Sequence, residues 1–523
     1  MKEIETERLA LQSRLDAQKT SKQRNELGQF ATPTLLASDI LAFAKSLIDP
    51  SASIRFLDPA LGTGAFYSAL LSQFESGRII NAAGFEIDSH YGEAAASLWG
   101  EYPLSVNVAD FTLMSPPDSE EKFNLLICNP PYVRHHHLKA EEKRRLAETA
   151  ARACGVPMNG LSGLYCYFLA IAHSWLADDG LAGWLIPSEF MDVNYGSAVK
   201  RYLLENVELL QVHRFDPKEL QFGDALVSSA VVWFRKRRPS THQQPVMSFG
   251  GTLQNPRYSR SVSRIDLAQC PKWSCLAQEA RKPTPGGLKL SDFFTIKRGV
   301  ATGDNSFFIM SPEKIASLGL PAEFFQPILP GPRYLETDII EAEPDGTPQL
   351  EKKLFILDCS LDKDEIDRQY PSLGRYLEAG RATAGETYIC GHRSPWYSQE
   401  RRPPAPFVCT YMGRGLSSRS KPFRFILNRS KATAANVYLM LYPKQPLSDA
   451  LAGDPALALE IWRFLNSIPS ETLLGEGRVY GGGLYKMEPK ELANVPAAAI
   501  MALLPPSKNL PVAQATFFDE FVA

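Results

Sequence analysis

The stretch Phe123-Asn124-Leu125-Leu126-Ile127-Cys128-Asn129-Pro130-Pro131-Tyr132 decides how this chain folds. Its first six residues are mostly apolar and predict a buried strand. Two consecutive prolines lack backbone donors and fix φ, so the strand cannot continue through them. Asn129 is therefore expected at the carboxyl end of a strand, where open α/β sheets place their ligands.

Short apolar runs alternate with helical stretches on both sides of this strand. The runs predicted as strands are 54–57, 82–86, 125–128, 181–186 and 227–234. This alternation predicts an α/β domain with a mainly parallel sheet. A charged, polar and proline-rich run follows at 235–245, which places a domain boundary near residue 240.

The chain has 523 residues, of which 44% are hydrophobic, and can bury more than one core. Beyond residue 240 the sequence consists of short mixed segments interrupted by Pro and Gly, which predicts a separate α+β domain. The predicted order is an N-terminal helical segment 1–27, a sheet domain 28–240, a connector 241–284 and a C-terminal domain 285–523.

Composition excludes several classes of protein. The eight cysteines form no C-x-x-C pair, and the polar segment 1–29 lacks an apolar signal, so we expect a reduced, cytoplasmic protein without structural zinc. No apolar run approaches the roughly 18–20 residues that cross a membrane. The net charge is only −2, so any surface that binds nucleic acid must be confined to one region.

A glycine-containing loop follows the first predicted strand as Asp58-Pro59-Ala60-Leu61-Gly62-Thr63-Gly64-Ala65-Phe66. Gly62 and Gly64 allow a tight turn and the close approach of a ligand, although an ordinary strand-to-helix turn explains them about as often. Glu86 ends the next strand about twenty residues further on, where doubly wound sheets bind ribose hydroxyls.

An acid and an aromatic residue, Asp110 and Phe111, stand at the end of another predicted strand. They are suited to accept from an adenine amino group and to pack against its ring, although Asp110 alone could be a loop cap. The sequence has no Gly-x-x-x-x-Gly-Lys-[Ser/Thr] motif for ATP phosphates. The predicted ligand is therefore adenosyl-like and need not carry phosphates.

The tetrad Asn129-Pro130-Pro131-Tyr132 resembles the active-site motif of the amino-methylating DNA methyltransferases. The order of Gly28-Gln29-Phe30-Ala31-Thr32-Pro33, the Asp58–Phe66 loop, the tetrad and a C-terminal domain is similar to that of the gamma (TaqI-type) N6-adenine DNA methyltransferases of restriction-modification systems. Over residues 28–234, the resemblance implies a Rossmann-like class I domain that binds S-adenosylmethionine. It also implies that residues 285–523 form a target-recognition domain.

The resemblance further implies which residues hold the cofactor. Phe30, Thr32 and Pro33 are expected to close over its methionine part, Asp58, Ala60 and Gly62 to line it, and Glu86 and Asp110 to bind its adenosine. The complete predicted set is Phe30, Thr32, Pro33, Asp58, Pro59, Ala60, Gly62, Gly64, Phe66, Glu86, Ile87, Asp110, Phe111 and Asn129.

The predicted catalytic residues are Asn129, Pro130, Pro131 and Tyr132. The lone pair of an exocyclic amine is delocalised into its ring, so two acceptors are needed to localise it. The Asn129 side-chain oxygen and the Pro130 carbonyl can each take one amino hydrogen. Cys128 points to the other side of the strand and is interpreted as a core residue.

The amine can be reached only if the adenine leaves the base stack, and Tyr132 offers a face to hold it. The resemblance favours Tyr195 as the second face, with Phe190 as the alternative, although either could be core. His135-His136-His137 is interpreted as a solvated or phosphate-facing loop, and we predict no metal site.

A basic segment lies between Arg393 and Lys431, with nine Lys and Arg residues against one acid. Aromatic residues interleave with it, which is typical of a sheet that packs on one face and meets DNA on the other, although a solvated basic surface is the alternative. The residues predicted to bind DNA are Arg298, Arg393, Arg401, Arg402, Arg414, Arg419, Lys421, Arg424 and Arg429.

The predicted partners are double-stranded DNA and a restriction endonuclease that acts on the same site, with the chain itself a monomer. Alternatives are methylation of RNA adenine or of a protein glutamine amide, and a DNA-binding protein without activity. Asp345 with Glu351, Lys352 and Lys353 loosely resembles a magnesium nuclease pattern, which would make the protein bifunctional.

Overall fold

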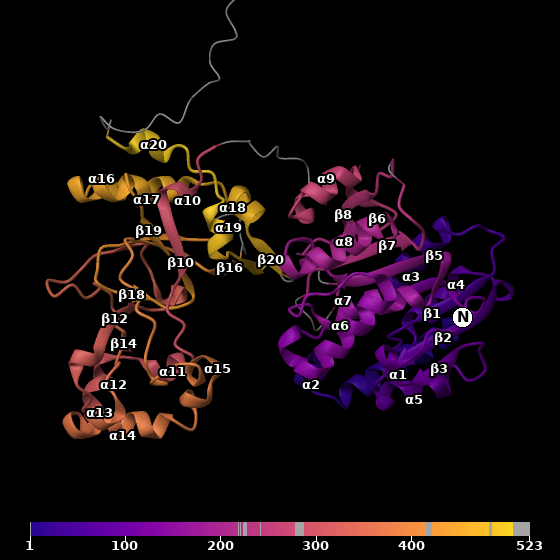
Figure 1. Ribbon diagram of the computed structural model, residues 1–523, viewed down its shortest axis with the longest axis horizontal. Coiled ribbons are helices and arrows are strands. Elements are labelled where there is room, and N and C mark those ends of the chain that lie inside the picture. Colours follow the sequence, from indigo (N-terminus) through magenta and orange to yellow (C-terminus); the bar gives the residue numbers. More distant parts are fainter. Residues whose placement is uncertain are drawn as a thin grey trace, which may run out of the picture. The chain divides into compact units, whose positions relative to one another are not determined.

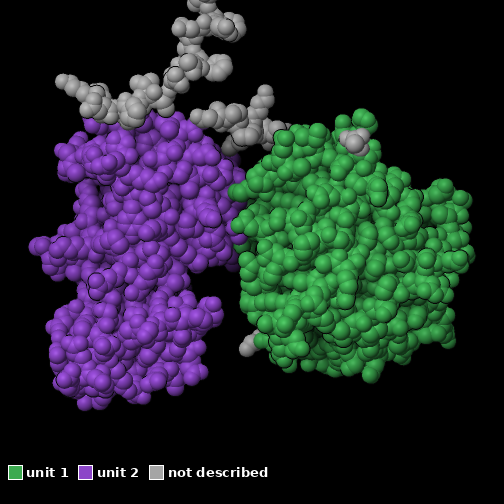
Figure 2. Space-filling model, in the orientation of Figure 1, with its two compact units in different colours: residues 1–282, 479–483 green, residues 283–478, 484–523 purple. Residues whose placement is uncertain are grey.

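The computed structural model describes residues 2–217, 219, 221–222, 227–240, 242–277, 287–414, 421–480 and 484–505. The chain divides into two compact units. Met1–Lys282 and Val479–Gly483 form the first unit, and Pro283–Arg478 and Leu484–Ala523 form the second (Figure 2).

A nine-stranded sheet in the order β3-β2-β1-β4-β5-β7-β6-β8-β9 forms the centre of the first unit (Figure 1). Strands β1 to β5 are parallel to one another, β7 is antiparallel to both β5 and β6, and β9 is antiparallel to β8. The predicted α/β class with a mainly parallel sheet is confirmed. The strands are β1 (Ile54–Asp58), β2 (Ile79–Glu86), β3 (Ser105–Val108), β4 (Phe123–Cys128), β5 (Leu176–Pro187), β6 (Glu208–Arg214), β7 (Ser229–Arg235), β8 (Val246–Gly251) and β9 (Pro256–Ser261).

Helices cover both faces of this sheet because successive residues of its central strands point to opposite sides. Leu125 and Ile127 of β4 pack with α3 and α4, whereas Leu126 and Cys128 pack with α6, α7 and α8. Cys128 is fully buried, as predicted for a core residue. The helices are α1 (Lys2–Ala17), α2 (Ser21–Leu27), α3 (Thr34–Leu47), α4 (Ala65–Gln73), α5 (Ser89–Leu98), α6 (Ala140–Cys154), α7 (Leu164–Ile171), α8 (Ser197–Glu205) and α9 (Arg264–Gln269).

The predicted end of the sheet domain near residue 240 is wrong. Strands β8 and β9 lie inside the predicted connector, and β8 extends the sheet by pairing with β6. The charged run that suggested a boundary begins at the end of β7, and its Arg237 pairs with Glu208 and Asp179 at the surface. A surface turn between two strands and a linker between domains have the same polar composition, so composition alone does not distinguish them.

The second unit is an α+β assembly that contains sheets in the orders β10-β19-β15-β17-β13 and β11-β14-β12-β18 and the antiparallel pair of β16 and β21. Its strands are β10 (Phe294–Arg298), β11 (Ile309–Met310), β12 (Phe325–Leu329), β13 (Ile339–Ile340), β14 (Phe355–Leu357), β15 (Phe407–Thr410), β16 (Met412–Arg414), β17 (Phe425–Asn428), β18 (Thr433–Ala434), β19 (Tyr438–Pro443) and β21 (Leu484–Lys486). In β20 (Arg478–Tyr480), the last two residues belong to the first unit. The helices of the second unit are α10 (Leu290–Phe293), α11 (Asn305–Phe308), α12 (Pro312–Ser317), α13 (Lys363–Gln369), α14 (Pro371–Gly380), α15 (Tyr388–Gly391), α16 (Leu447–Gly453), α17 (Leu457–Ser467), α18 (Ser470–Glu476), α19 (Pro489–Ala493) and α20 (Ile500–Leu503). Among the described residues, no helix is both long enough and apolar enough to cross a membrane.

The packing of β5 against β7 predicts the effect of adding one methyl group. A Cβ on Gly183 would lie 2.6 Å from the ring of Trp233 and 2.9 Å from Ile127, in the centre of the sheet. We expect Gly183→Ala to lower the free energy of unfolding by about 1–3 kcal/mol, as overpacked cores do. Gly77→Ala is the control, because a Cβ there meets nothing within 4 Å. Equal midpoints for both variants in urea unfolding would contradict this packing.

Candidate active site

The candidate site lies where the strand order reverses. β1 and β4 are parallel neighbours, with Phe56 opposite Leu125, while β2 and β5 lie on their outer sides. The carboxyl ends of β1 and β4 therefore open onto one crevice of the kind that binds ligands in open α/β sheets. The loop after Asp58 and the tetrad after Cys128 both begin at this edge.

Hydrogen bonds that Asn129 donates to residues 28–33, called here the 28–33 strip, fix its side chain. Its amide nitrogen donates to the carbonyl of Phe30 and to Oγ1 of Thr32, both at 3.1 Å. Because the amide hydrogens are directed at these two oxygens, the side-chain oxygen of Asn129 is left as the acceptor. Within the described residues, no hydrogen bond uses this oxygen or the carbonyl oxygen of Pro130.

A glycine brings the strip against the tetrad. The carbonyl of Gly28 accepts from the backbone N–H of Tyr132 at 3.2 Å, and Gly28 has a left-handed φ of 63°. A Cβ on this residue would lie 2.5 Å from the Tyr132 nitrogen. Only glycine fits both the conformation and the distance. No local pattern in the sequence links Gly28 to Tyr132, so their contact is visible only in the folded chain.

The ring of Tyr132 is held from three directions. Its hydroxyl donates to the carbonyl of Leu185 at 3.1 Å, and its centroid lies 5.7 Å from Phe30 and 6.0 Å from Phe222. Burial raises the pKa of Tyr132, so the phenol stays neutral at physiological pH. The ring is therefore a rigid apolar wall beside Asn129, with its hydroxyl already bonded.

The glycine loop wraps around the end of β2. The backbone N–H of Leu61 donates to the Phe85 carbonyl at 2.8 Å, and that of Gly62 donates to the Glu86 carboxylate at 3.0 Å. Gly64 has a φ of 86°, and a Cβ there would lie 2.5 Å from the Trp99 indole nitrogen. The loop thus presents half-exposed backbone at Ala60 and Gly62, without side chains that would exclude a ligand.

Two carboxyl groups with shifted pKa values lie along this loop. Burial raises the pKa of Asp58 to about 8, and the nearby charge of Glu86 adds to the effect. Burial also raises the pKa of Glu86, against the hydrogen bonds from Asp88 and Gly62 that lower it. Buried acids held at the edge of a crevice are typical of functional sites.

The other predicted cofactor residues divide into pocket and core. Ile87 beside Glu86 is 68% exposed, so it offers an open apolar surface. Asp110 accepts from the backbone N–H and the hydroxyl of Thr112, which is the alternative role of a loop cap, and its second oxygen lies 3.7 Å from Arg145. Thr32 is nearly buried and Pro33 is exposed.

Two predicted contacts with the cofactor need correction. Phe66 is 2% exposed and packs in the core beneath the glycine loop, because α4 points it into the sheet. Phe111 is also 2% exposed and lies against Phe85 and Trp175, with centroids 5.4 and 5.0 Å away. Both rings support the wall of the pocket and present no open face to it.

The structure separates the two candidates for the second face of the base pocket. Phe190 is fully buried and packs near Trp273, so the alternative that it is core holds. Tyr195 is half-buried, and its hydroxyl donates to Glu189. His135–His137 form an exposed single turn after the tetrad. Among the described residues, no group of three His, Cys, Asp or Glu side chains could hold a metal.

Most of the described cations in the predicted basic segment are bonded to other groups of the second unit. Arg393 donates to the carbonyls of Ala301 and Thr302, and Arg424 pairs with Asp338 at 2.6 Å. Arg402 and Arg429 pair with glutamates, and Lys421 donates to the Asn466 carbonyl. The interleaved aromatics Tyr397, Phe407, Tyr411, Phe423 and Phe425 are at most 3% exposed. Arg419 lies outside the described residues.

Three further predicted cations are exposed, one outside this segment and two within it. Arg298 and Arg414 are exposed, and Arg298 stacks 4.0 Å above the ring of Tyr411. Arg401 is 79% exposed and lies 3.9 Å from Asp358. The predicted nuclease pattern is a surface turn, because Asp345 accepts from the backbone N–H and the hydroxyl of Thr347 and Lys352 covers the ring of Tyr334.

The raised pKa of Asp58 predicts how stability changes with pH. Between its ordinary pKa of 3.8 and about 8, the folded chain keeps a proton that the unfolded chain has lost, so the protein loses up to about 1.4 kcal/mol of stability per pH unit. Asp58→Asn keeps the acceptor for the Ala60 N–H and removes the titration. We expect its melting temperature to exceed that of the wild type by a margin that grows from pH 4 to 8. A constant margin in calorimetry would refute the buried acid.

Comparisons with known proteins agree with this geometry. Residues 79–221 match the family described as Eco57I restriction-modification methylase, and residues 279–514 match the family described as Type II methyltransferase M.Eco57I, C-terminal domain. Type II methyltransferase M.XamI of Xanthomonas campestris pv. amaranthicola is 28% identical over 473 residues, which are 89% of this chain and 84% of that protein. Type II methyltransferase M.AccI of Acinetobacter calcoaceticus is 25% identical over 496 residues, or 90% and 85% of the two chains.

A solved structure has a similar fold. The Type IIL restriction-modification enzyme MmeI, in complex with DNA, aligns with a TM-score of 0.53 and 14% identity over 88% of this chain and 63% of that chain, so this chain spans less than two thirds of its length. The first unit has the Rossmann-like fold of class I methyltransferases. The chain is thus similar to restriction-modification methylases of the Eco57I type over residues 79–221 and 279–514 and to type II methyltransferases over most of its length, and S-adenosylmethionine is its methyl donor.

Proposed function

We propose that this chain methylates N6 of an adenine within a specific sequence of duplex DNA, as the modification enzyme of a type II restriction-modification system. One observation carries the proposal. The amide of Asn129 is oriented by Phe30 and Thr32 so that its oxygen and the Pro130 carbonyl remain as two acceptors at the crevice. Two acceptors on a rigid turn suit a planar amine that must give up its conjugation.

The chain's own residues prepare the amine for transfer. The Asn129 side-chain oxygen and the Pro130 carbonyl each accept one amino hydrogen, which localises the nitrogen lone pair and orients it. S-adenosylmethionine supplies an electrophilic methyl group on a sulfonium ion. No enzyme nucleophile is required, and burial raises the pKa of the Cys128 thiol well above its ordinary value.

The cofactor is assigned to the glycine loop and its neighbours. Glu86 is assigned to the ribose hydroxyls, Ile87 and Asp110 to the adenine, and the remaining half-exposed backbone at Ala60 and Gly62 to the methionine part. This assignment is supported by the exposure of Ile87 and by the absence of a Cβ at Gly62. Asp58, Phe30, Thr32 and Pro33 complete the proposed enclosure.

The target adenine is proposed to leave the duplex and stack between Tyr132 and Tyr195. The fixed ring of Tyr132 supports this arrangement, since a rigid face loses little entropy when a base stacks on it. Displacement of the base also requires contacts that hold the remaining duplex, and we assign these contacts to the second unit.

The proposed DNA surface of the second unit centres on β16 and Tyr411. Arg414 lies on β16, Arg298 stacks on the Tyr411 ring, and Lys486 on the paired strand β21 lies 5.2 Å from that ring. The exposed Arg298 and Arg414 replace the buried and paired arginines of the predicted segment as phosphate ligands, whereas Lys486 is paired with Glu488 at 2.9 Å. The proposed partners are duplex DNA and a cognate endonuclease, with the chain acting as a monomer.

Methyl transfer provides the direct test. Incubation of the protein with methyl-labelled S-adenosylmethionine and duplex DNA, followed by nucleoside analysis, should give labelled N6-methyladenine. Label in cytosine, only in RNA, or in a protein glutamine would reject the assignment. Asn129→Ala should lower the rate by at least about a hundredfold, because it removes a donor–acceptor contact made at the reacting amine. Asn255→Ala, in an exposed turn, should match the wild type.

Salt dependence tests the DNA surface. Arg298→Gln with Arg414→Gln should weaken duplex binding and flatten the slope of log affinity against log salt by about two, since each lost phosphate contact contributes about one. Arg368→Gln with Arg375→Gln, on exposed faces of α13 and α14, is the matched control. An unchanged slope in the first pair would move the DNA surface to another part of the second unit.

A further inference from the structure

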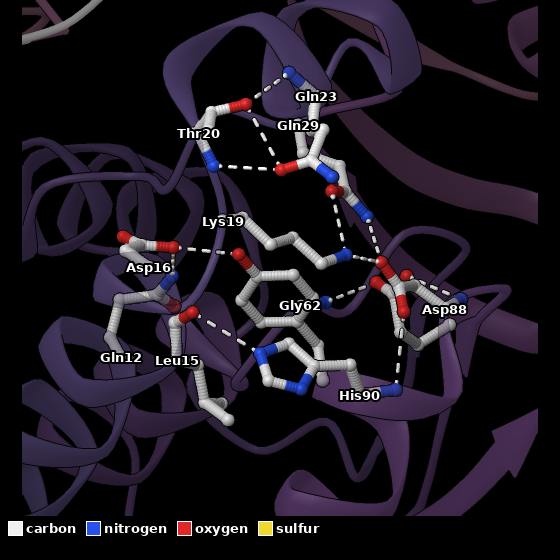
Figure 3. A network of polar contacts seen from close by, with 12 residues as sticks. Gln12, Leu15, Asp16, Lys19, Thr20, Gln23, Gln29, Gly62, Asp88 and His90 are labelled. Atoms are coloured by element: carbon white, nitrogen blue, oxygen red, sulfur yellow. Dashed lines mark hydrogen bonds and ion pairs between the residues drawn. The ribbon is translucent and has the colours of Figure 1, made fainter.

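The N-terminal helical segment joins the glycine loop through a polar network. Lys19, just after α1, forms an ion pair with Asp88 in which the two side chains are only 18% and 15% exposed. Gln29 donates to the same Asp88 oxygen at 2.8 Å and accepts from Lys19 at 3.5 Å. Figure 3 shows these side chains converging from the two ends of the segment on Asp88.

Asp88 is hydrogen-bonded directly to Glu86, so the contacts that fix Asp88 also restrict the Glu86 carboxylate. The backbone N–H of Asp88 donates to one oxygen of the Glu86 carboxylate at 3.0 Å, and Gly62 donates to the other at 3.0 Å. The second side-chain oxygen of Asp88 caps α5 by accepting from the N–H of His90. Asp88 is therefore fixed from two sides, and its position determines where the Glu86 carboxylate points.

Lys19 itself is held in place by surrounding contacts. Arg24 donates to the carbonyls of Asp16 and Lys19 at 2.8 and 3.1 Å, which fixes the turn after α1. The ammonium of Lys19 lies 4.9 Å from the ring centroid of Tyr91, whose hydroxyl donates to Asp16 at 2.7 Å. So many contacts around a charged side chain that is mostly buried indicate a fixed geometry and not a solvated surface pair.

The strip that contains Gln29 also orients the catalytic amide, because Phe30 accepts from Asn129 at 3.1 Å. A displaced Lys19 would therefore shift Glu86 through Asp88, and it would shift the 28–33 strip through Gln29. Neither pathway requires Lys19 to touch a ligand.

We infer that Lys19 is a positioning residue of the cofactor site: by holding Asp88 and Gln29, it fixes the carboxylate of Glu86 for the ribose of S-adenosylmethionine. The N-terminal segment is then one wall of the site and not an appendage of the sheet domain. The inference rests on the proposed role of Glu86, but it is independent of which base or molecule receives the methyl group.

Cofactor binding in the absence of DNA tests the inference. In calorimetric titration of the full chain with S-adenosylmethionine, Lys19→Met should raise Kd about tenfold. Losses of about this size occur in metal sites when a residue that orients a ligating side chain is removed. Lys19→Arg should restore binding to within about threefold, because it keeps the charge-assisted hydrogen bond. Lys45→Met, which removes a surface lysine bonded to the Gln73 carbonyl, should leave Kd unchanged.

A second variant separates positioning from folding. Asp88→Asn keeps the cap of α5 and removes the ion pair, so it should raise Kd as Lys19→Met does, and the double variant should be no worse than either single one. Kinetics should show a raised KM for the cofactor with kcat changed much less. Three results would overturn the inference: additive effects of the two substitutions, an unchanged Kd in Lys19→Met, or a control variant Lys45→Met in which Kd rises and the melting temperature falls as much as in Lys19→Met. Tight cofactor binding without DNA methylation would instead reject the proposed function alone.

Discussion

The double proline after β4 is the constraint on which the rest of the site depends. Pro130 and Pro131 follow a strand beside β1 that is buried except at Asn124, at the position where the sheet order reverses. Because the strand cannot continue, the half-buried Asn129 and the Pro130 carbonyl lie at its end without being part of a strand ladder. The 28–33 strip then supplies the acceptors that orient Asn129. Geometry at this turn is thus set by covalent structure before any ligand arrives.

Local signals in the sequence predicted the centre of the first unit and of the candidate site. The prolines, the loop glycines and the acid at the end of β2 each act within a few residues, so their positions could be inferred without tertiary contacts. The ion pair between Lys19 and Asp88 joins residues 69 positions apart and leaves no local pattern. The strands β8 and β9 were missed for a related reason, because a polar turn before them resembles a linker.

The basic segment of the second unit shows a different limit. Its composition correctly indicates many arginines, but not whether each faces solvent or an acid distant in sequence. Arg424 meets Asp338 and Arg429 meets Glu341, both across 86 to 88 positions. A count of charge over a window includes only neighbours, so it overestimates the free positive surface wherever such pairs form. Exposure at Arg298 and Arg414, on short strands outside the ion pairs, could be seen only in the folded chain.

The extension of the sheet to β9 has a consequence for how copies of the chain behave in solution. An outermost strand leaves a row of backbone groups open to pairing with another molecule, which is a common origin of aggregation. β9 begins with Pro256, and its side chains alternate in exposure, with Arg257 and Arg260 among them. Arg257 is paired with Asp216 and Glu219. A residue without a donor and charged side chains along the strand both disfavour strand-to-strand association. β8 and β9 therefore enlarge the core, and the composition of β9 also disfavours pairing with a second molecule at that edge of the sheet.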